Sequence, residues 1–114
     1  MEKKNAVAAL ASLAQSSRLD IFRLLVQAGP EGLSAGKIGE AVGILPSSLS
    51  FHLKELGIGS MVTSRQEGRY VIYTANFDTM NGLLVFLTEN CCDGNACSAV
   101  PVPACNPETI GETT

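Results

Sequence analysis

The cysteines of this 114-residue chain carry its clearest chemical signal. All four, Cys91, Cys92, Cys97 and Cys105, fall in the last quarter of the sequence. A disulfide framework would join elements spread over the whole fold, so thiols gathered at one end favour metal or redox chemistry. Cys91 and Cys92 are adjacent, and a short polar segment, residues 93–96, separates them from Cys97. This spacing allows the three thiolates to converge.

Three converging thiolates suit a trivalent metalloid. Arsenic(III) and antimony(III) are soft and thiophilic, and they take three sulfur ligands in a pyramid, which a pliable loop can supply. We therefore expect Cys91, Cys92 and Cys97 to bind As(III) or Sb(III), with Cys105 as an additional candidate ligand. Closing such a loop would pull on the element before it, so the site would act as a switch and not as a catalyst.

Three other interpretations of the same thiols remain open. Zinc or cadmium could be held by four thiolates if Cys105 joins the set, although adjacent cysteines are unusual in a compact zinc site. A redox sensor could close a disulfide, but acidic surroundings disfavour the reactive thiolate. The cysteines could also be inert, although exposed free thiols are normally a liability. We rank As(III) or Sb(III) first, another thiophilic metal second and redox third.

Two helices are predicted at the start of the chain. Over residues 6–14, Val7, Leu10 and Leu13 follow helical spacing, and the alanine-rich surface suits close packing against another helix at an interface. Residues 17–20 have the form of a capping box before the apolar run 21–26, which predicts a second helix with Ser17 as its N-cap.

The next segment has the features of a helix-turn-helix. Ser34 is placed to cap a third helix over residues 35–42, and Gly43 supplies a flexible corner. Pro46 suits the first turn of a fourth helix, which we expect to end early, at residue 56 or 57. Its apolar residues 49, 53 and 56 share one face and leave a hydroxyl-rich outer face.

A hairpin and a last helix complete the predicted domain. Residues 61–65 and 70–74 are rich in β-formers, and Gly68 can take the positive φ that a tight hairpin needs. Asn76 can cap a fifth helix with an apolar stripe suited to pairing with the first helix across a dimer, formed by Met80, Leu83, Leu84 and Leu87. The expected fold class is mainly α with a β-hairpin wing, a dimeric winged helix-turn-helix of order α-α-α-α-β-β-α. We expect residues 1–90 to form this domain and residues 91–114 to form a flexible tail.

The charge is divided unevenly along the chain. Residues 1–88 hold all eight Lys and Arg against seven acids, whereas residues 89–114 hold four acids and no base. A weakly basic body can bind DNA if its cations share one face and dimerisation doubles them. The sequence has no apolar run long enough to span a membrane and no signal-peptide pattern, which points to the cytoplasm.

Three segments in this order resemble the ArsR family of arsenic-responsive repressors. They are LAQSSRL at residues 13–19, PSSLSFHLKEL at 46–56 and VTSRQEGRY at 62–70. The resemblance covers residues 6–90 and implies a homodimer that inserts its fourth helix into the major groove of operator DNA. The best-known arsenic repressors carry a Cys-x-Cys pair in the third helix, which this chain lacks. It looks like the subset that has a vicinal cysteine pair and a third cysteine near the C-terminus.

The expected DNA contacts are polar or basic side chains of the fourth helix and the wing: Ser47, Ser48, Ser50, His52, Lys54, Arg65 and Arg69. Serines near a helix start can approach phosphates and base edges, and wing arginines can meet the backbone or a narrow minor groove. The serines could instead be caps, the histidine a local hydrogen-bonding group and the arginines solvated charges.

An enzyme is not expected from this sequence. It has no phosphate-binding Gly-rich loop, no Cys-x₅-Arg oxyanion site and no histidine near a cysteine. A protein-interaction module that uses the helix-turn-helix only as a scaffold is disfavoured by the hydroxyl-rich, nearly acid-free outer face of residues 46–54. The predicted function is a repressor that needs no cofactor and dissociates from DNA when it binds its inducer.

Overall fold

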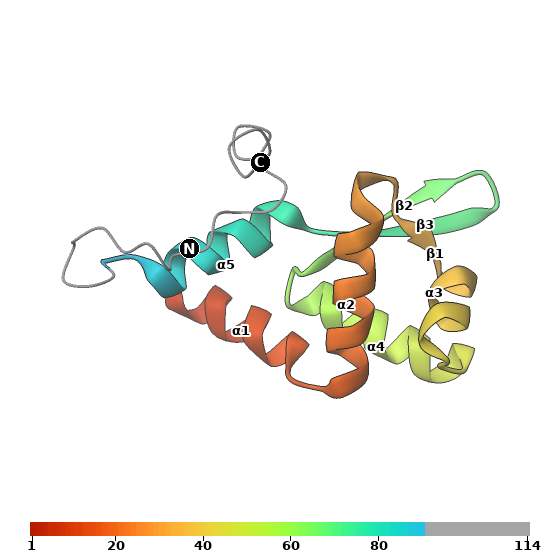
Figure 1. Cartoon of the computed structure of the whole chain (residues 1–114), viewed down its shortest axis with the longest axis horizontal. Coiled ribbons are helices and arrows are strands. Elements are labelled where there is room, and N and C mark those ends of the chain that lie inside the picture. The colour runs from red at the N-terminus through yellow and green to blue at the C-terminus, as the bar shows by residue number, and fades with distance from the viewer. Residues whose placement is uncertain (91–114) are drawn as a thin grey trace, which may run out of the picture.

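The structure, a computed structural model, describes residues 1–90 (Figure 1). The predictions for Cys91, Cys92, Cys97 and Cys105, and for the tail, lie outside these residues. The described elements are α1 (Lys3–Leu13), α2 (Ser16–Ala28), the 3₁₀ helix η1 (Gly29–Glu31), β1 (Leu33–Ser34), α3 (Ala35–Val42), α4 (Pro46–Ile58), β2 (Val62–Glu67), β3 (Tyr70–Ala75) and α5 (Phe77–Thr88). This order confirms the predicted winged helix-turn-helix, with a helical body and a hairpin wing. None of the described helices is long and apolar enough to cross a bilayer.

Two of the predicted helix starts are confirmed by their caps. Ser34 Oγ accepts a hydrogen bond from the Lys37 amide at 3.3 Å, and Asn76 Oδ1 accepts one from the Thr79 amide at 3.2 Å. Each bond satisfies an amide that has no partner within its helix. The predicted cap of the second helix was wrong: the N-cap of α2 is Gln15 and not Ser17, and the Gln15 side chain accepts a hydrogen bond from the Arg18 amide.

The wing belongs to a three-stranded antiparallel sheet in the order β1-β3-β2. The β2–β3 hairpin pairs Glu67 with Tyr70 across a two-residue turn, and Gly68 in that turn has the predicted positive φ of 60°. Strand β1 was not predicted. It pairs Leu33 with Tyr73 of β3 and so ties the base of the wing to the segment that leads into α3.

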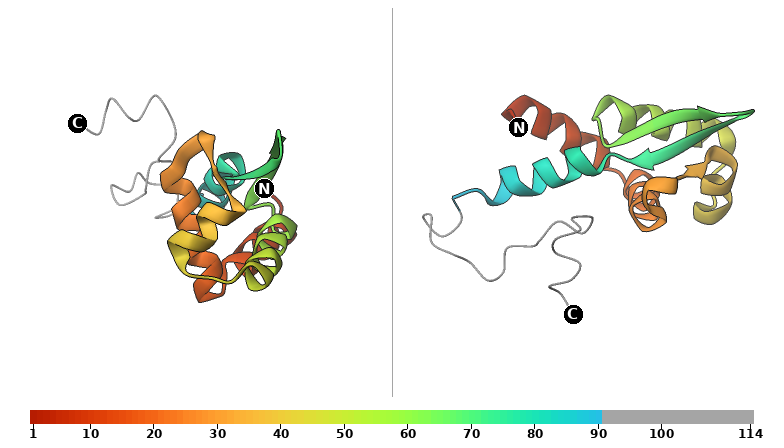
Figure 2. Two further views of the ribbon diagram at one scale, coloured as in Figure 1. Left: turned by 90° about the vertical axis from the view of Figure 1, so that its right-hand side faces the viewer. Right: turned by 90° about the horizontal axis from the view of Figure 1, so that it is seen from above.

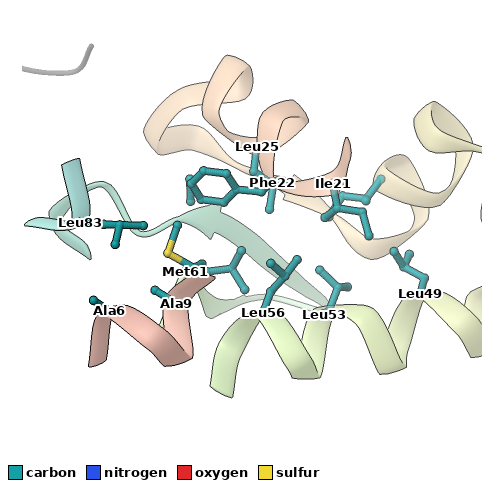
Figure 3. Packing of buried hydrophobic residues seen from close by; sticks show 13 residues of the cluster. Ala6, Ala9, Ile21, Phe22, Leu25, Leu49, Leu53, Leu56, Met61 and Leu83 are labelled. Atoms are coloured by element: carbon teal, nitrogen blue, oxygen red, sulfur yellow. The ribbon is translucent and has the colours of Figure 1, made fainter. Parts of the chain in front are cut away.

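The core lies between α2 and α4, with α1, α5 and the base of the wing closing its sides (Figure 3). In Figure 3 the side chains of Leu49, Leu53 and Leu56 point from α4 toward Ile21 and its neighbours on α2. All three leucines are buried, as their spacing predicted. The core residues are Ala6, Ala9, Ile21, Phe22, Leu25, Ile38, Leu49, Leu53, Leu56, Met61, Val62, Ala75 and Leu83.

Helix α1 packs through small side chains. Its buried residues are Ala6, Ala9 and Ser12, whereas Val7 and Leu10 are exposed. The close approach of α1 to the end of α4 occurs at Gly59, where an added Cβ would lie 2.4 Å from Ser12 Oγ.

Helix α4 ends at Ile58 and has Gly59 as its C-cap, so the prediction that this helix ends at residue 56 or 57 was wrong.

Helices α1 and α5 lie side by side at one end of the molecule, and α3 and the wing tip lie at the other (Figures 1 and 2). Both helices expose large apolar side chains: Val7 and Leu10 on α1, and Val85 and Leu87 on α5. Of the stripe predicted for α5, Leu83 is buried in the core, while Leu87 is exposed. The end of the molecule formed by α1 and α5 therefore presents apolar surface to solvent.

Candidate nucleic-acid interface

The corner between α3 and α4 sets the direction of the fourth helix. Gly43 takes φ +70° and ψ 39°, the left-handed conformation that glycine adopts without steric cost, and its amide donates to the Gly39 carbonyl at 2.8 Å. Gly39 allows a close contact between the two helices, because a Cβ there would lie 3.1 Å from the Ile44 carbonyl oxygen. The corner holds α4 against α3 and leaves one face of α4 in solvent.

That solvent face carries the hydroxyl and amino groups predicted from the sequence. Ser47, Ser48, Ser50 and Lys54 are all exposed, on the part of α4 that is turned away from its buried leucines. The structure thus brings these four predicted residues together on one helix. Short hydroxyl side chains with one cation can approach both phosphates and base edges.

The N-terminus of α4 has no side-chain cap. Its N-cap residue is Leu45 and its first residue is Pro46, with no side-chain hydrogen bond to the first-turn amides. The interpretation of Ser47 as the cap is therefore not supported. Free amides and the positive end of the helix dipole make this terminus attractive to a phosphate.

His52 and Phe51 are neighbours on α4 with different exposure. His52 is half-buried on the flank of the core face, and its Nδ1 is buried without a hydrogen-bond partner among the described residues. Its ring meets the Phe51 ring edge-on, with centroids 5.8 Å apart. Phe51 is 56% exposed, and no role was predicted for it from the sequence. The signal was present, since Phe51 stands two residues from both Leu49 and Leu53 and so must point away from the core.

A groove connects α4 to the wing. It has a volume of about 330 Å³, and its polar lining includes Ser50 and Lys54 from α4 and Thr63 and Ser64 from β2. The exposed hydroxyls of the helix thus continue onto the first wing strand. Helix and wing together form one polar surface that a nucleic-acid backbone can follow.

Comparison with known proteins identifies the class of protein to which this chain belongs. Residues 13–59 match a family model described as a helix-turn-helix domain. The chain is also 33% identical over 73 residues to the uncharacterized HTH-type transcriptional regulator YceK of Bacillus subtilis (strain 168), an alignment that covers 64% of this chain and 72% of YceK. The chain belongs to the helix-turn-helix transcriptional regulators. Members of this class bind DNA and are not enzymes, which confirms the prediction that the chain has no catalytic activity.

Solved structures show which helix-turn-helix fold this regulator has. An ArsR-like transcriptional regulator from Rhodococcus sp. RHA1 superposes with a TM-score of 0.66 at 23% identity, covering 74% of this chain and 76% of the other. The winged helix-turn-helix domain Mb0332 from Mycobacterium bovis, described as homodimeric, DNA-binding and a possible ArsR-family regulator, gives 0.63 at 23% identity, covering 82% and 87%. The regulator therefore has the ArsR-like winged-helix fold that its sequence resembles.

The two wing arginines of this regulator have different surroundings. The Arg65 guanidinium pairs with Glu67 and donates to the backbone carbonyls of Glu31 at 2.8 Å and of Pro30 at 3.3 Å. Arg69 lies exposed at the turn, and its side chain makes no hydrogen bond or ion pair within residues 1–90. Arg65 thus braces the wing against η1, the 3₁₀ helix that follows α2, a role that the sequence did not indicate. DNA contacts by both residues stay predictions.

The dependence of DNA affinity on salt concentration can distinguish a phosphate contact by Arg69 from bracing of the wing by Arg65. Replacing Arg69 by alanine removes one cation from each wing tip, so we expect the slope of log affinity against log salt to fall by about two for a dimer. Replacing Arg65 by alanine should weaken binding by loosening the wing while the slope stays the same. Fluorescence anisotropy titrations at several salt concentrations measure both slopes. If the Arg65 variant lowers the slope as much as the Arg69 variant does, Arg65 is itself a phosphate contact.

Proposed function

We propose that this regulator is a homodimeric repressor that binds operator DNA through α4 and the wing, and releases it when its cysteines bind As(III) or Sb(III). The observation that carries the DNA-binding part is the solvent face of α4. Exposed hydroxyls and Lys54 lie opposite the buried leucines, beside a helix N-terminus whose amides no side chain caps. In helix-turn-helix proteins such a helix enters the major groove, while the wing contacts the backbone.

The apolar surface of α1 and α5 supports the dimer. Val7 and Val85 are 59% and 56% exposed, and two copies that pair through these helices would bury both. The end formed by α1 and α5 lies away from the wing tip, so pairing there leaves both wings free (Figure 2). The similar domain Mb0332 is described as homodimeric, which agrees with this arrangement.

The position of the cysteines in the sequence supports a coupling between inducer and dimer. Helix α5 ends at Thr88, and only two residues separate Thr88 from Cys91 in the sequence. A ligand that draws Cys91, Cys92 and Cys97 together would act directly on the end of a dimer helix. Because the two α4 helices must match the spacing of two half-sites, a small shift at the dimer contact is enough to weaken DNA binding.

Native mass spectrometry tests the thiolate ligands. Arsenous acid, As(OH)₃, condenses with three thiols to form three arsenic–sulfur bonds and releases three waters. We expect one arsenic per chain for the wild type and for Cys105→Ser. Arsenic should be held at least about tenfold more weakly by Cys91→Ser, Cys92→Ser and Cys97→Ser, since each leaves two sulfur ligands.

The same titration distinguishes the other interpretations. Equal arsenic binding by the wild type and all four single variants contradicts the three-thiolate site. If zinc or cadmium binds more tightly than arsenic, and only with Cys105 present, the regulator is a sensor of divalent metals with four thiolates. A loss of two mass units on mild oxidation, with no metal bound, indicates a disulfide switch.

A further inference from the structure

An exposed phenylalanine stands at the centre of the proposed DNA-reading face. Phe51 is 56% exposed, in the middle of α4. At roughly 100° per residue it lies about 200° around the helix from Leu49 and the same from Leu53, both of which are buried. The phenyl ring therefore points almost directly away from the core. So large an apolar side chain contributes no burial energy while it stays in water, and it gains free energy when a partner covers it.

The neighbours of Phe51 show what kind of partner would fit. Ser47 lies one turn before it on the same face, and Lys54 and Glu55 lie one turn after it. The ring is an apolar group among a hydroxyl and two opposite charges, whereas the centre of a protein interface is depleted of charge and enriched in several large side chains. Ile58, two turns further on, is also exposed but borders a recess shared with Met1 and Ala8. Leu45 is also exposed but lies at the N-cap, six residues before Phe51, so Phe51 is separated along the helix from both of these residues.

The major groove of DNA offers a matching apolar group. Among base-pair edges only thymine carries a methyl group, and apolar side chains such as alanine and phenylalanine contact it there. We propose that Phe51 of each subunit packs on the 5-methyl group of one thymine in each operator half-site. Its contact would select thymine over cytosine, which lacks the methyl group. The inference rests on the proposed binding of operator DNA and is independent of the cysteines.

Deleting the methyl group from the DNA tests the contact without disturbing the protein. A palindromic duplex that the wild type selects from a random library is remade with deoxyuridine at one symmetric pair of thymines at a time. Deoxyuridine keeps the hydrogen-bonding edge of thymine and lacks only the methyl group. Affinities are measured by fluorescence anisotropy for the wild type, for Phe51→Ala and for the control Leu19→Ala. Leu19 is also an exposed apolar residue, but it lies on α2.

We expect one pair of positions at which deoxyuridine weakens wild-type binding about fourfold per half-site, or about fifteenfold for both, the loss that corresponds to one buried methyl group each. At that pair Phe51→Ala should bind both duplexes equally, while Leu19→Ala should behave as the wild type. The inference is overturned if the selected half-sites contain no thymine, if no position responds, or if Phe51→Ala responds as the wild type does. If the wild type selects no duplex at all, the proposed function itself fails.

Discussion

Replacing Val85 by glutamate is expected to convert the dimer to monomers and to lower operator affinity by about a hundredfold or more. Val85 is 56% exposed on α5, so the monomer can accept the charge, whereas two carboxylates at a symmetric contact would be desolvated and would repel each other. A monomer engages one half-site only and loses the gain in affinity that comes from linking two binding units. Sedimentation velocity measures the mass, and fluorescence anisotropy measures the affinity.

The control for this variant is Val85→Leu, which keeps an apolar side chain of similar reach and should leave both mass and affinity close to those of the wild type. Circular dichroism of both variants shows whether the helices are intact. A glutamate variant that remains a folded dimer with unchanged affinity places the dimer contact elsewhere and contradicts the proposed pairing through α1 and α5.

Gly32→Ala should cause a large loss of stability, about 4 kcal/mol. Gly32 has φ +70° and ψ −171°, a conformation that is essentially restricted to glycine and costs an alanine about 2 kcal/mol, and the new Cβ would lie 2.4 Å from the Tyr73 carbonyl oxygen and 2.6 Å from Thr74 Cγ2. Forcing a methyl group into so close a contact costs about 1–3 kcal/mol more. Because Gly32 directly precedes β1, this change also disturbs the strand that ties the wing to the body.

Gly29→Ala is the matched control. Gly29 has a similar φ of +74°, but a Cβ there meets nothing within 4 Å. Its ψ of −162° is also similar, so this variant should lose only the conformational part, about 2 kcal/mol. Urea unfolding measures both free energies. If the two variants lose the same free energy of unfolding, β3 leaves room for a methyl group at Gly32, which contradicts the close contact.

Local signals in the sequence were enough to predict most of the elements. The caps Ser34 and Asn76 and the turn residue Gly68 act on their nearest neighbours, so their roles can be inferred without the fold. Strand β1 could not be predicted in this way. It has two residues, Leu33 and Ser34, which is too short for any alternation, and it exists only because β3 lies beside it in the folded chain.

The difference between local signals and contacts that form only in the folded chain also applies to the candidate site. The solvent face of α4 followed from the spacing of its three leucines, whereas the Arg65 contacts join residues 34 and 35 positions apart, which no local pattern shows. On α1, the alanine-rich surface that was predicted to pack closely against another helix includes Ala6 and Ala9, which are buried in the core. The contact of Ser12 with Gly59 could not be predicted, because these two residues meet only in the folded chain.

The most direct test of the proposed repressor is fluorescence anisotropy of a labelled operator duplex with the wild-type dimer bound, titrated with arsenite under reducing conditions. We predict that anisotropy falls to the value of free DNA at about one arsenite per chain, and that Cys91→Ser binds the same duplex but keeps it bound. If arsenite leaves the wild-type complex intact at a saturating concentration, the chain remains a DNA-binding regulator but its inducer is not As(III).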